Sequence, residues 1–230
     1  MKFIVAIDGP AGTGKSSVAR AVAKKLNFVY VDTGAIYRAL ALLVHRSQAE
    51  PNNMSEVLLL IPKLKVQIDL YEHRTFIKLD DQVVESELRT EQISKLSSVI
   101  SQHQEVREKL LELQRSLAQK INNGAIFEGR DIGTVVFPNA PVKIYITANS
   151  ETRAERRFLE VKNNQPQASY QDILDSIILR DMRDKSRSNA PMLQAPDAVV
   201  IDTSHMSLDE VITKTLSLIK KAQSSIGKKP

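Results

Sequence analysis

A glycine-rich loop near the start of the chain is the feature that most restricts its possible folds. The apolar run Phe3–Ile7 precedes this loop, and a helical pattern over residues 17–26 follows it. Two glycines, a lysine and a serine match the pattern G-x-x-x-x-G-K-[ST], namely Gly9, Gly14, Lys15 and Ser16. Because the motif requires a strand before it and a helix after it, and the sequence offers both, we expect a P-loop.

Each part of this loop suits a chain of phosphate groups. Glycine lets the backbone turn its N–H groups toward phosphate oxygens, and the following helix adds the positive end of its dipole. Lys15 can reach the β- and γ-phosphates, and the Ser16 hydroxyl can ligate Mg²⁺. The expected nucleotide-binding residues are Gly9, Pro10, Ala11, Gly12, Thr13, Gly14, Lys15, Ser16 and Ser17.

Four more apolar runs rich in β-branched residues follow the first, with helical patterns between them. They read as near-continuous hydrophobic segments, which is typical of buried parallel strands. Strands that alternate with helices predict an α/β fold in which helices flank a five-stranded parallel sheet. The further runs are Phe28–Val31, Ala125–Phe127, Val142–Thr147 and Ala198–Ile201.

Two of the helical patterns predict which face is buried. Residues 104–122 place five apolar side chains on one face: Val106, Leu110, Leu113, Leu117 and Ile121. The last helix opens with Ser207 and Glu210 at the spacing of a capping box. Its expected buried residues are Leu208, Val211, Ile212, Thr215 and Ile219.

Residues 64–85 interrupt the alternation of strands and helices. Val66, Ile68 and Leu70 alternate with polar residues, and the apolar segments Phe76–Leu79 and Val83–Val84 follow. This pattern predicts a small antiparallel sheet inserted between the second and third core strands as a subdomain.

The net charge of +5 and the pI near 9.3 raise the possibility of nucleic-acid binding. Four of the lysines lie in residues 220–230, which contain no acid, so the rest of the chain is nearly neutral. Aromatic residues make up 5% of the chain, which leaves few side chains to stack on unpaired bases. We therefore expect no nucleic-acid partner.

The sequence holds no cysteine, which excludes disulfides, thiolate metal sites and cysteine nucleophiles. Its apolar runs fall short of the roughly 18–20 residues that span a bilayer, and Asp8 stops the first run. We expect a cytoplasmic protein without a membrane partner, and we expect a monomer.

The group that receives the phosphoryl group defines the class of a P-loop protein. Water as the acceptor indicates an NTPase, and a small molecule indicates a kinase. The insertion is large enough to cover a small acceptor, which favours a kinase.

Four sequence blocks resemble the bacterial cytidylate kinase family over nearly the whole chain. They are residues 9–17, residues 32–38 (DTGAIYR), residues 128–138 (EGRDIGTVVFP) and residues 180–187 (RDMRDKSR). The resemblance implies that ATP, with Mg²⁺, phosphorylates CMP and dCMP by direct in-line transfer. It also implies one kinase domain: a core (1–33, 104–150 and 168–222), a region that binds the nucleoside monophosphate (NMP region, about 34–103), a LID (about 151–167) and a flexible basic tail (223–230).

The acceptor phosphate is assigned to a hydroxyl and two arginines. Thr33 follows a strand and opens a helix, where a capping hydroxyl and free N–H groups can meet an anion. Arg38 lies one turn into that helix, and the sequence alone is equally compatible with a surface arginine. The resemblance implies a phosphate-binding role for Thr33, Arg38 and Arg130, although the family usually has serine where this chain has Thr33.

The resemblance assigns the cytosine base to Asp131, together with Ser98 and Arg107. A carboxylate can accept a hydrogen bond from the 4-amino group of cytosine, whereas uracil has a carbonyl there. On their own, Ser98 and Arg107 are an ordinary loop serine and an ordinary helix-surface arginine.

Two further groups of charged residues complete the predicted site. Arg180, Asp184 and Arg187 share one face of a helix, where spacing alone also fits a solvated salt-bridge ladder. The resemblance places these three residues around the ribose hydroxyls and the phosphates. Arg153 and Arg157 resemble the basic LID helix that closes over ATP, and Arg156 is not excluded. The predicted catalytic residues are Lys15, Arg130, Arg153 and Arg157.

No general base is needed, because a phosphate monoester is mostly a dianion at neutral pH. The four histidines match no motif. Catalysis is therefore expected to rest on positioning and charge neutralisation. The alternatives are a kinase for another small acceptor, such as AMP or shikimate, and a nucleotide-dependent nucleic-acid-binding protein.

Overall fold

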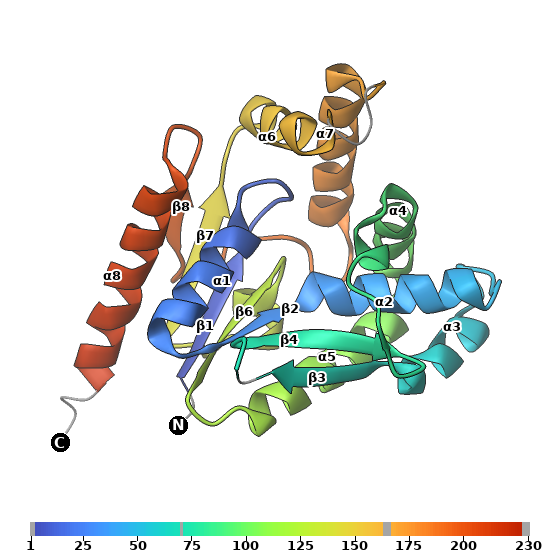
Figure 1. Cartoon of the computed structure of the whole chain (residues 1–230), viewed down its shortest axis with the longest axis horizontal. Helices are drawn as coiled ribbons and strands as arrows, with labels where there is room; N and C mark the ends of the chain where they lie inside the picture. The colour runs from blue at the N-terminus through green and yellow to red at the C-terminus, as the bar shows by residue number, and fades with distance from the viewer. Residues whose placement is uncertain (1–2, 70, 163–166, 227–230) are drawn as a thin grey trace.

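The computed structural model describes residues 3–69, 71–162 and 167–226, and it has one eight-stranded sheet with helices on both faces (Figure 1). Its core is five parallel strands in the order β2-β6-β1-β7-β8. All five predicted strands are confirmed to within two residues at each end. They are β1 (Phe3–Asp8), β2 (Val29–Asp32), β6 (Gly124–Gly129), β7 (Val142–Thr147) and β8 (Val199–Asp202).

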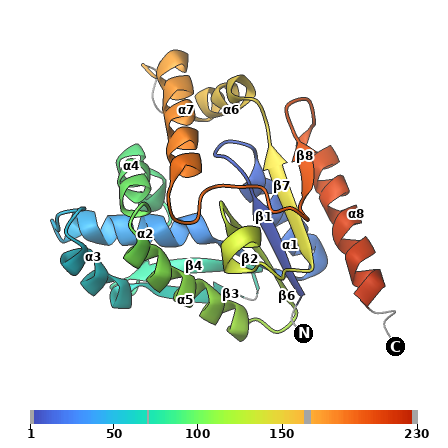
Figure 2. The ribbon, with the colours of Figure 1, turned by 180° about the vertical axis from the view of Figure 1, so that it is seen from behind.

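Strand β1 lies at the centre of the sheet and contributes to a hydrophobic core on each face. Val5 and Ile7 pack in the core formed with α1 (Lys15–Leu26) and α8 (Leu208–Ile226). Ile4 and Ala6 point to the other core, which contains α2 (Thr33–Arg46) and α5 (Gln104–Lys120). Figure 2 shows α5 in front of the sheet when the molecule is seen from behind. Because both faces are covered, the strands are apolar throughout, as parallel strands usually are.

The remaining helices pack against α2 or lie near the carboxyl ends of the strands. Helices α6 and α7 lie beyond the carboxyl ends of β1 and β7 (Figure 1). Open α/β sheets place ligands at this edge. The bounds are α3 (Met54–Leu60), α4 (Glu91–Ile100), α6 (Ser150–Lys162), α7 (Tyr170–Ser186) and the short turns η1 (Ile61–Lys63), η2 (Glu87–Arg89) and η3 (Ile132–Val136).

The predicted antiparallel insertion is present, and it extends the core sheet. Strands β3 (Lys65–Asp69), β4 (Arg74–Leu79) and β5 (Gln82–Val83) pair antiparallel. Strand β4 also pairs in parallel with β2, and the Tyr30 amide donates to the His73 carbonyl at 2.8 Å. This pairing covers the exposed edge of β2. Leu70, which we expected in this region, lies outside the described residues.

The two helix predictions hold in their main features. In α8 the Ser207 amide donates to the Glu210 carboxylate (2.8 Å), and the Glu210 amide donates to the Ser207 hydroxyl (3.3 Å), which confirms the capping box. The prediction that Leu208 is buried is wrong, because it is 50% exposed in the first turn. Within the described ranges, no helix is long and apolar enough to cross a membrane.

Candidate active site

The glycine-rich loop runs from the end of β1 to the start of α1, and its shape depends on two glycines. Gly9 has φ of 141°, and a Cβ atom there would lie 2.0 Å from the Ile146 carbonyl oxygen. Gly14 has φ of 85° and caps α1 in the left-handed region. Only glycine adopts both conformations readily, so the predicted loop motif is also a backbone requirement.

Lys15 is buried at the start of α1. Its ammonium group donates to the Pro10 carbonyl at 2.6 Å, and no carboxylate pairs with it among the residues that the structure describes. Burial, followed by the nearby charge of Arg130, lowers the pKa of Lys15 to about 7. A buried cation with so little compensation favours an anionic ligand at this point.

Beside the loop, Ser16 is part of a group of oxygen atoms that we did not predict. The Tyr30 hydroxyl donates to the Glu128 carboxylate at 2.8 Å and also interacts with Ser16. Burial raises the pKa of Tyr30 well above its ordinary value. Hydroxyl and carboxylate oxygens suit Mg²⁺, which keeps most of its waters and takes few protein ligands. Among the residues that the structure describes, histidine, cysteine, aspartate and glutamate side chains form no cluster of three or more that could hold a metal ion.

At the start of α2, the structure corrects one detail of the prediction. The helix cap is Asp32, whose carboxylate accepts from the Ala35 amide at 2.9 Å. Thr33 is the first helical residue, and its hydroxyl donates to the Glu128 carbonyl at 2.7 Å. The carboxylate of Asp32 also pairs with Arg38 at 2.8 Å. Asp32 accepts strongly from both partners, so it takes the cap position that we expected for Thr33.

Three arginines, Arg130, Arg180 and Arg187, act on one buried carboxylate, that of Asp184. Arg130 Nε donates to Asp184 at 2.9 Å, and Arg187 lies 3.7 Å from the same carboxylate. Burial works to raise the pKa of Asp184, but Arg130 and Arg187 hold that pKa below its usual range. Four guanidinium nitrogens are buried without a hydrogen-bond acceptor in the described residues: Nε of Arg38, Nε of Arg107, Nε of Arg180 and Nη2 of Arg187.

Arg180 is the least compensated member of this group. Within the described ranges its side chain makes no hydrogen bond or ion pair, and burial, followed by the charge of Arg130, lowers the pKa of Arg180 to about 10. Buried N–H groups of native proteins are nearly always paired. The excess of positive charge and the unpaired donors therefore suit a phosphate group.

A second buried ion pair joins Arg107 of α5 to Asp131, which follows β6. Both residues are 7% exposed. The Arg107 guanidinium lies 5.5 Å from the centre of the Tyr37 ring and also donates to the Ser101 carbonyl at 3.3 Å. The structure thus brings two of the three predicted base-binding residues together. Ser98 lies on α4, where its carbonyl accepts from the Ser101 hydroxyl at 3.2 Å.

The three arginines of α6 have different surroundings. Arg153 is buried and donates to the Ala11 carbonyl at 3.1 Å, so it is bonded to the glycine-rich loop. It also pairs with Asp181 of α7 at 2.7 Å. Arg156 donates to the Thr203 carbonyl at 2.7 Å. Arg157 lies one turn beyond Arg153 and pairs with Glu160 at 3.0 Å on the exposed surface.

Several residues of the site escaped the sequence prediction, and Asp8 is the clearest example. Its carboxylate is buried and accepts from the amides of Ile132 (2.8 Å) and Gly133 (2.7 Å). Burial raises the pKa of Asp8 to about 6. In the sequence, Asp8 lies between the first strand and the loop motif, and this position predicts only the end of the strand. Glu128 and Asp181 stand beside predicted residues, but their spacing alone carried no signal.

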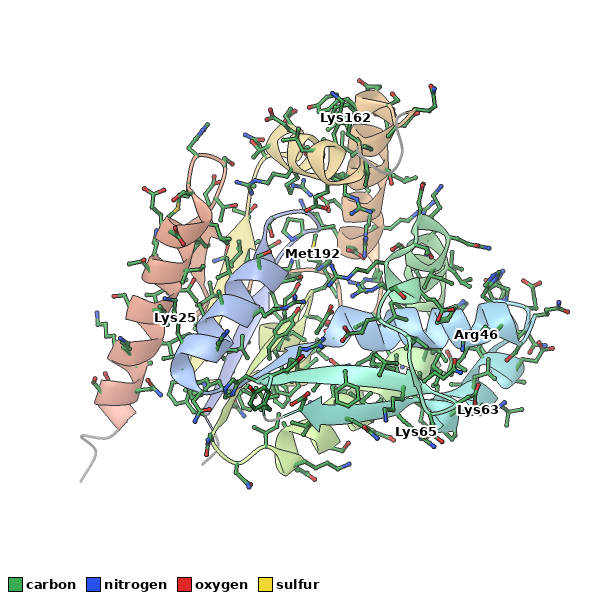
Figure 3. All side chains as sticks on the ribbon, viewed as in Figure 1. Lys25, Arg46, Lys63, Lys65, Lys162 and Met192 are labelled. Carbon is green, nitrogen blue, oxygen red and sulfur yellow. The ribbon has the colours of Figure 1, made fainter. Side chains whose placement is uncertain are left out.

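The segment after α7 is also held to the site. Met192, labelled in Figure 3, is buried, and its amide donates to the Asp184 carbonyl at 2.8 Å. Figure 2 shows this connection crossing in front of the sheet between α7 and β8.

Known proteins that share one description are similar to this chain over nearly its whole length. A sequence profile of the family described as cytidylate kinase matches residues 5–221. A cytidylate kinase of Caldicellulosiruptor saccharolyticus is 41% identical over 220 residues, which cover 96% of each chain. A cytidylate kinase of Limosilactobacillus reuteri is 39% identical over 227 residues, which cover 97% of each chain.

Among solved structures, an uncharacterized protein from Eubacterium ventriosum superposes with a TM-score of 0.53. The match covers 95% of this chain and 99% of that one, at 12% sequence identity. This similarity supports the fold alone.

Proposed function

The chain belongs to the cytidylate kinase family, and from this premise we propose how its residues bind ATP and CMP and transfer the phosphoryl group. It is a nucleoside monophosphate kinase that phosphorylates CMP. The observation that carries the residue assignments is the convergence of three groups at one sheet edge. These groups are the phosphate-binding loop with Lys15, the arginines around Asp184, and the buried Arg107–Asp131 pair.

In this proposal the loop holds the phosphates of ATP through its backbone N–H groups and Lys15 neutralises charge on the transferred group. Ser16 would hold Mg²⁺, which would supply charge neutralisation for the phosphates of ATP. Glu128 and Tyr30 supply further oxygen atoms beside Ser16, which supports this assignment.

The acceptor nucleotide is assigned to the opposite side of the site. Asp131, Arg107 and Ser98 would bind the cytosine of CMP or dCMP, and Asp184 would bind the ribose. The unpaired guanidinium nitrogens support a role in binding the acceptor phosphate. The residues assigned to that phosphate are Thr33, Arg38, Arg130, Arg180 and Arg187.

The reaction then needs positioning more than proton transfer. An oxygen of the CMP phosphate attacks the γ-phosphorus of ATP, a new P–O bond forms, and the bond to the β,γ-bridging oxygen breaks to release ADP. The attacking phosphate is already a dianion near pH 7. Arginines and Lys15 bring the two anionic groups together and stabilise the charge that they share in the transition state.

Closure of the site would exclude water, with residues 34–103 covering the acceptor and residues 151–167 covering ATP. Arg153 is bonded to the loop, so we assign it to holding α6 in place over ATP. Arg157 is on the surface one turn further along, and we assign it to the phosphates of ATP, for which it would exchange its present partner Glu160. The assigned residues all belong to one chain, and we propose that the enzyme acts as a monomer.

The depressed pKa of Lys15 predicts that ATP binding takes up a proton above pH 7. The phosphates of ATP favour the charged ammonium and raise its pKa, so affinity is highest below pH 7. It should fall by at most about tenfold per pH unit as the pH rises from about 7. Titration calorimetry at pH 8, in buffers of different ionisation enthalpy, measures this proton uptake. A binding heat that does not depend on the buffer would contradict the prediction, and Lys15→Ala is the matched control that should lose the dependence.

The substrate assignment is tested by ADP release from ATP with CMP, dCMP, UMP, AMP, shikimate or RNA as the acceptor. We expect turnover with CMP and dCMP, with kcat/KM for UMP and AMP lower by about 100-fold or more. Preferred turnover with AMP or shikimate would indicate another kinase, and ATP hydrolysis that depends on RNA would indicate a nucleic-acid-binding protein.

A further inference from the structure

The buried carboxylate of Asp8 connects the two halves of the site. Asp8 is the last residue of β1 and directly precedes Gly9, the first glycine of the phosphate-binding loop. Its Oδ1 accepts from the Ile132 amide at 2.8 Å, and its Oδ2 accepts from the Gly133 amide at 2.7 Å. These two amides immediately follow Asp131, the residue assigned to the base.

The backbone around Asp131 is held from both directions. The amides of Val135 and Val136 donate to its carbonyl at 2.9 Å and 3.1 Å, which closes the turn η3. On the other side, the amides that open this turn are bonded to Asp8. A buried N–H that loses its acceptor is costly, so these bonds hold the turn at a defined place beside β1.

Asp8 is surrounded by few groups that could take over its role. The charges that influence it are those of Asp131 and Lys15, and the aliphatic stem of Lys143 packs near Gly133. The Lys143 ammonium itself pairs with Asp197 at 2.9 Å. Among the residues that the structure describes, only Asp8 offers side-chain acceptors to the Ile132 and Gly133 amides.

We infer that Asp8 is a positioning residue for base selection: it fixes the Asp131 carboxylate relative to the phosphate-binding loop, so that cytosine is read at the correct distance from ATP. This inference rests on the proposed role of Asp131 in reading cytosine. Discrimination by hydrogen bonds depends strongly on geometry, so a small displacement of Asp131 should weaken the rejection of uracil.

The experiment compares kcat/KM for CMP and UMP at saturating ATP in wild type and four variants. Asp8→Asn keeps one acceptor and turns an amide donor toward a backbone N–H, so the CMP:UMP ratio should fall about tenfold. Gly133→Ala would place a Cβ atom 3.3 Å from Asp8 Oδ2 and 3.1 Å from the stem of Lys143. Gly133→Ala should lower the CMP:UMP ratio by a smaller factor than Asp8→Asn. If Asp8→Asn does not fold, Gly133→Ala is the variant that decides the test.

Asp32→Asn is the matched control. It makes the same change from carboxylate to amide at Asp32, which caps α2 in the acceptor region. This variant should lower kcat/KM for CMP and for UMP in parallel. Asp131→Asn reports on the proposed function itself. If it collapses the ratio while folded Asp8→Asn and Gly133→Ala both keep the wild-type ratio, the inference is overturned and the base assignment stands. If Asp131→Asn leaves the ratio unchanged, both are overturned.

Discussion

Lys15→Ala is expected to lower kcat about 1,000-fold while the chain keeps its fold. Among the residues that the structure describes, the ammonium group bonds only to the Pro10 carbonyl and to the Thr13 hydroxyl (3.5 Å), so its loss breaks no ion pair there. Burial also penalises the charged form of Lys15 in the free protein. The charge of Lys15 therefore contributes little to folding. Release of ADP at saturating ATP and CMP measures the effect.

The matched control is Lys25→Ala, at an exposed lysine of the same helix (Figure 3). It should leave both kcat and the melting temperature near their wild-type values. Turnover of a folded Lys15→Ala variant within tenfold of wild type would contradict the assignment of the loop.

Asp131→Asn is expected to lower the ratio of kcat/KM for CMP over UMP by about 100-fold. An amide can present its N–H to the uracil carbonyl, whereas the carboxylate accepts from the cytosine amino group. The variant also leaves the Arg107 charge buried without its carboxylate, so the melting temperature should fall.

The ratio separates these two effects, because both substrates are compared in one enzyme preparation and any loss of folded protein cancels. A ratio that stays at the wild-type value while the melting temperature falls would limit Asp131 to a structural role.

The strands of the core could be predicted because burial on both faces leaves a local mark. Each of the five runs is short, apolar and bounded by polar residues or turns, and each forms a strand. No local pattern in the sequence indicates how the inserted strands join the core sheet. Strand β4 joins β2 through a single pair of residues, Tyr30 and Arg74, and that contact depends on which edge of the sheet is free.

The candidate site likewise has a part that could be predicted from local sequence and a part that could not. Residues of the loop are contiguous, and their roles follow from backbone geometry over a few residues. The partners of the charged side chains are far apart in sequence, as with Arg107 and Asp131 or Arg130 and Asp184. Neither pair follows from spacing, and only the family resemblance had placed these residues in one site.

Competition between neighbouring side chains also decides details that the sequence leaves open. Asp32 and Thr33 could both cap α2, and the choice fell to Asp32 because its carboxylate also accepts from Arg38. Likewise Arg153 and Arg157 lie one turn apart on α6, yet only Arg153 contacts the loop. Such choices depend on which atoms the rest of the fold brings within hydrogen-bond distance.

The parallel core and the glycine-rich loop could be predicted from the sequence alone, because they follow from periodicity and from backbone requirements over a few residues. The tertiary structure added which charged side chains pair with one another, and that the Asp8 carboxylate accepts from the Ile132 and Gly133 amides in the turn after Asp131. This pairing depends on burial, because water solvates an exposed carboxylate or guanidinium, whereas a buried one is costly unless a specific partner compensates its charge.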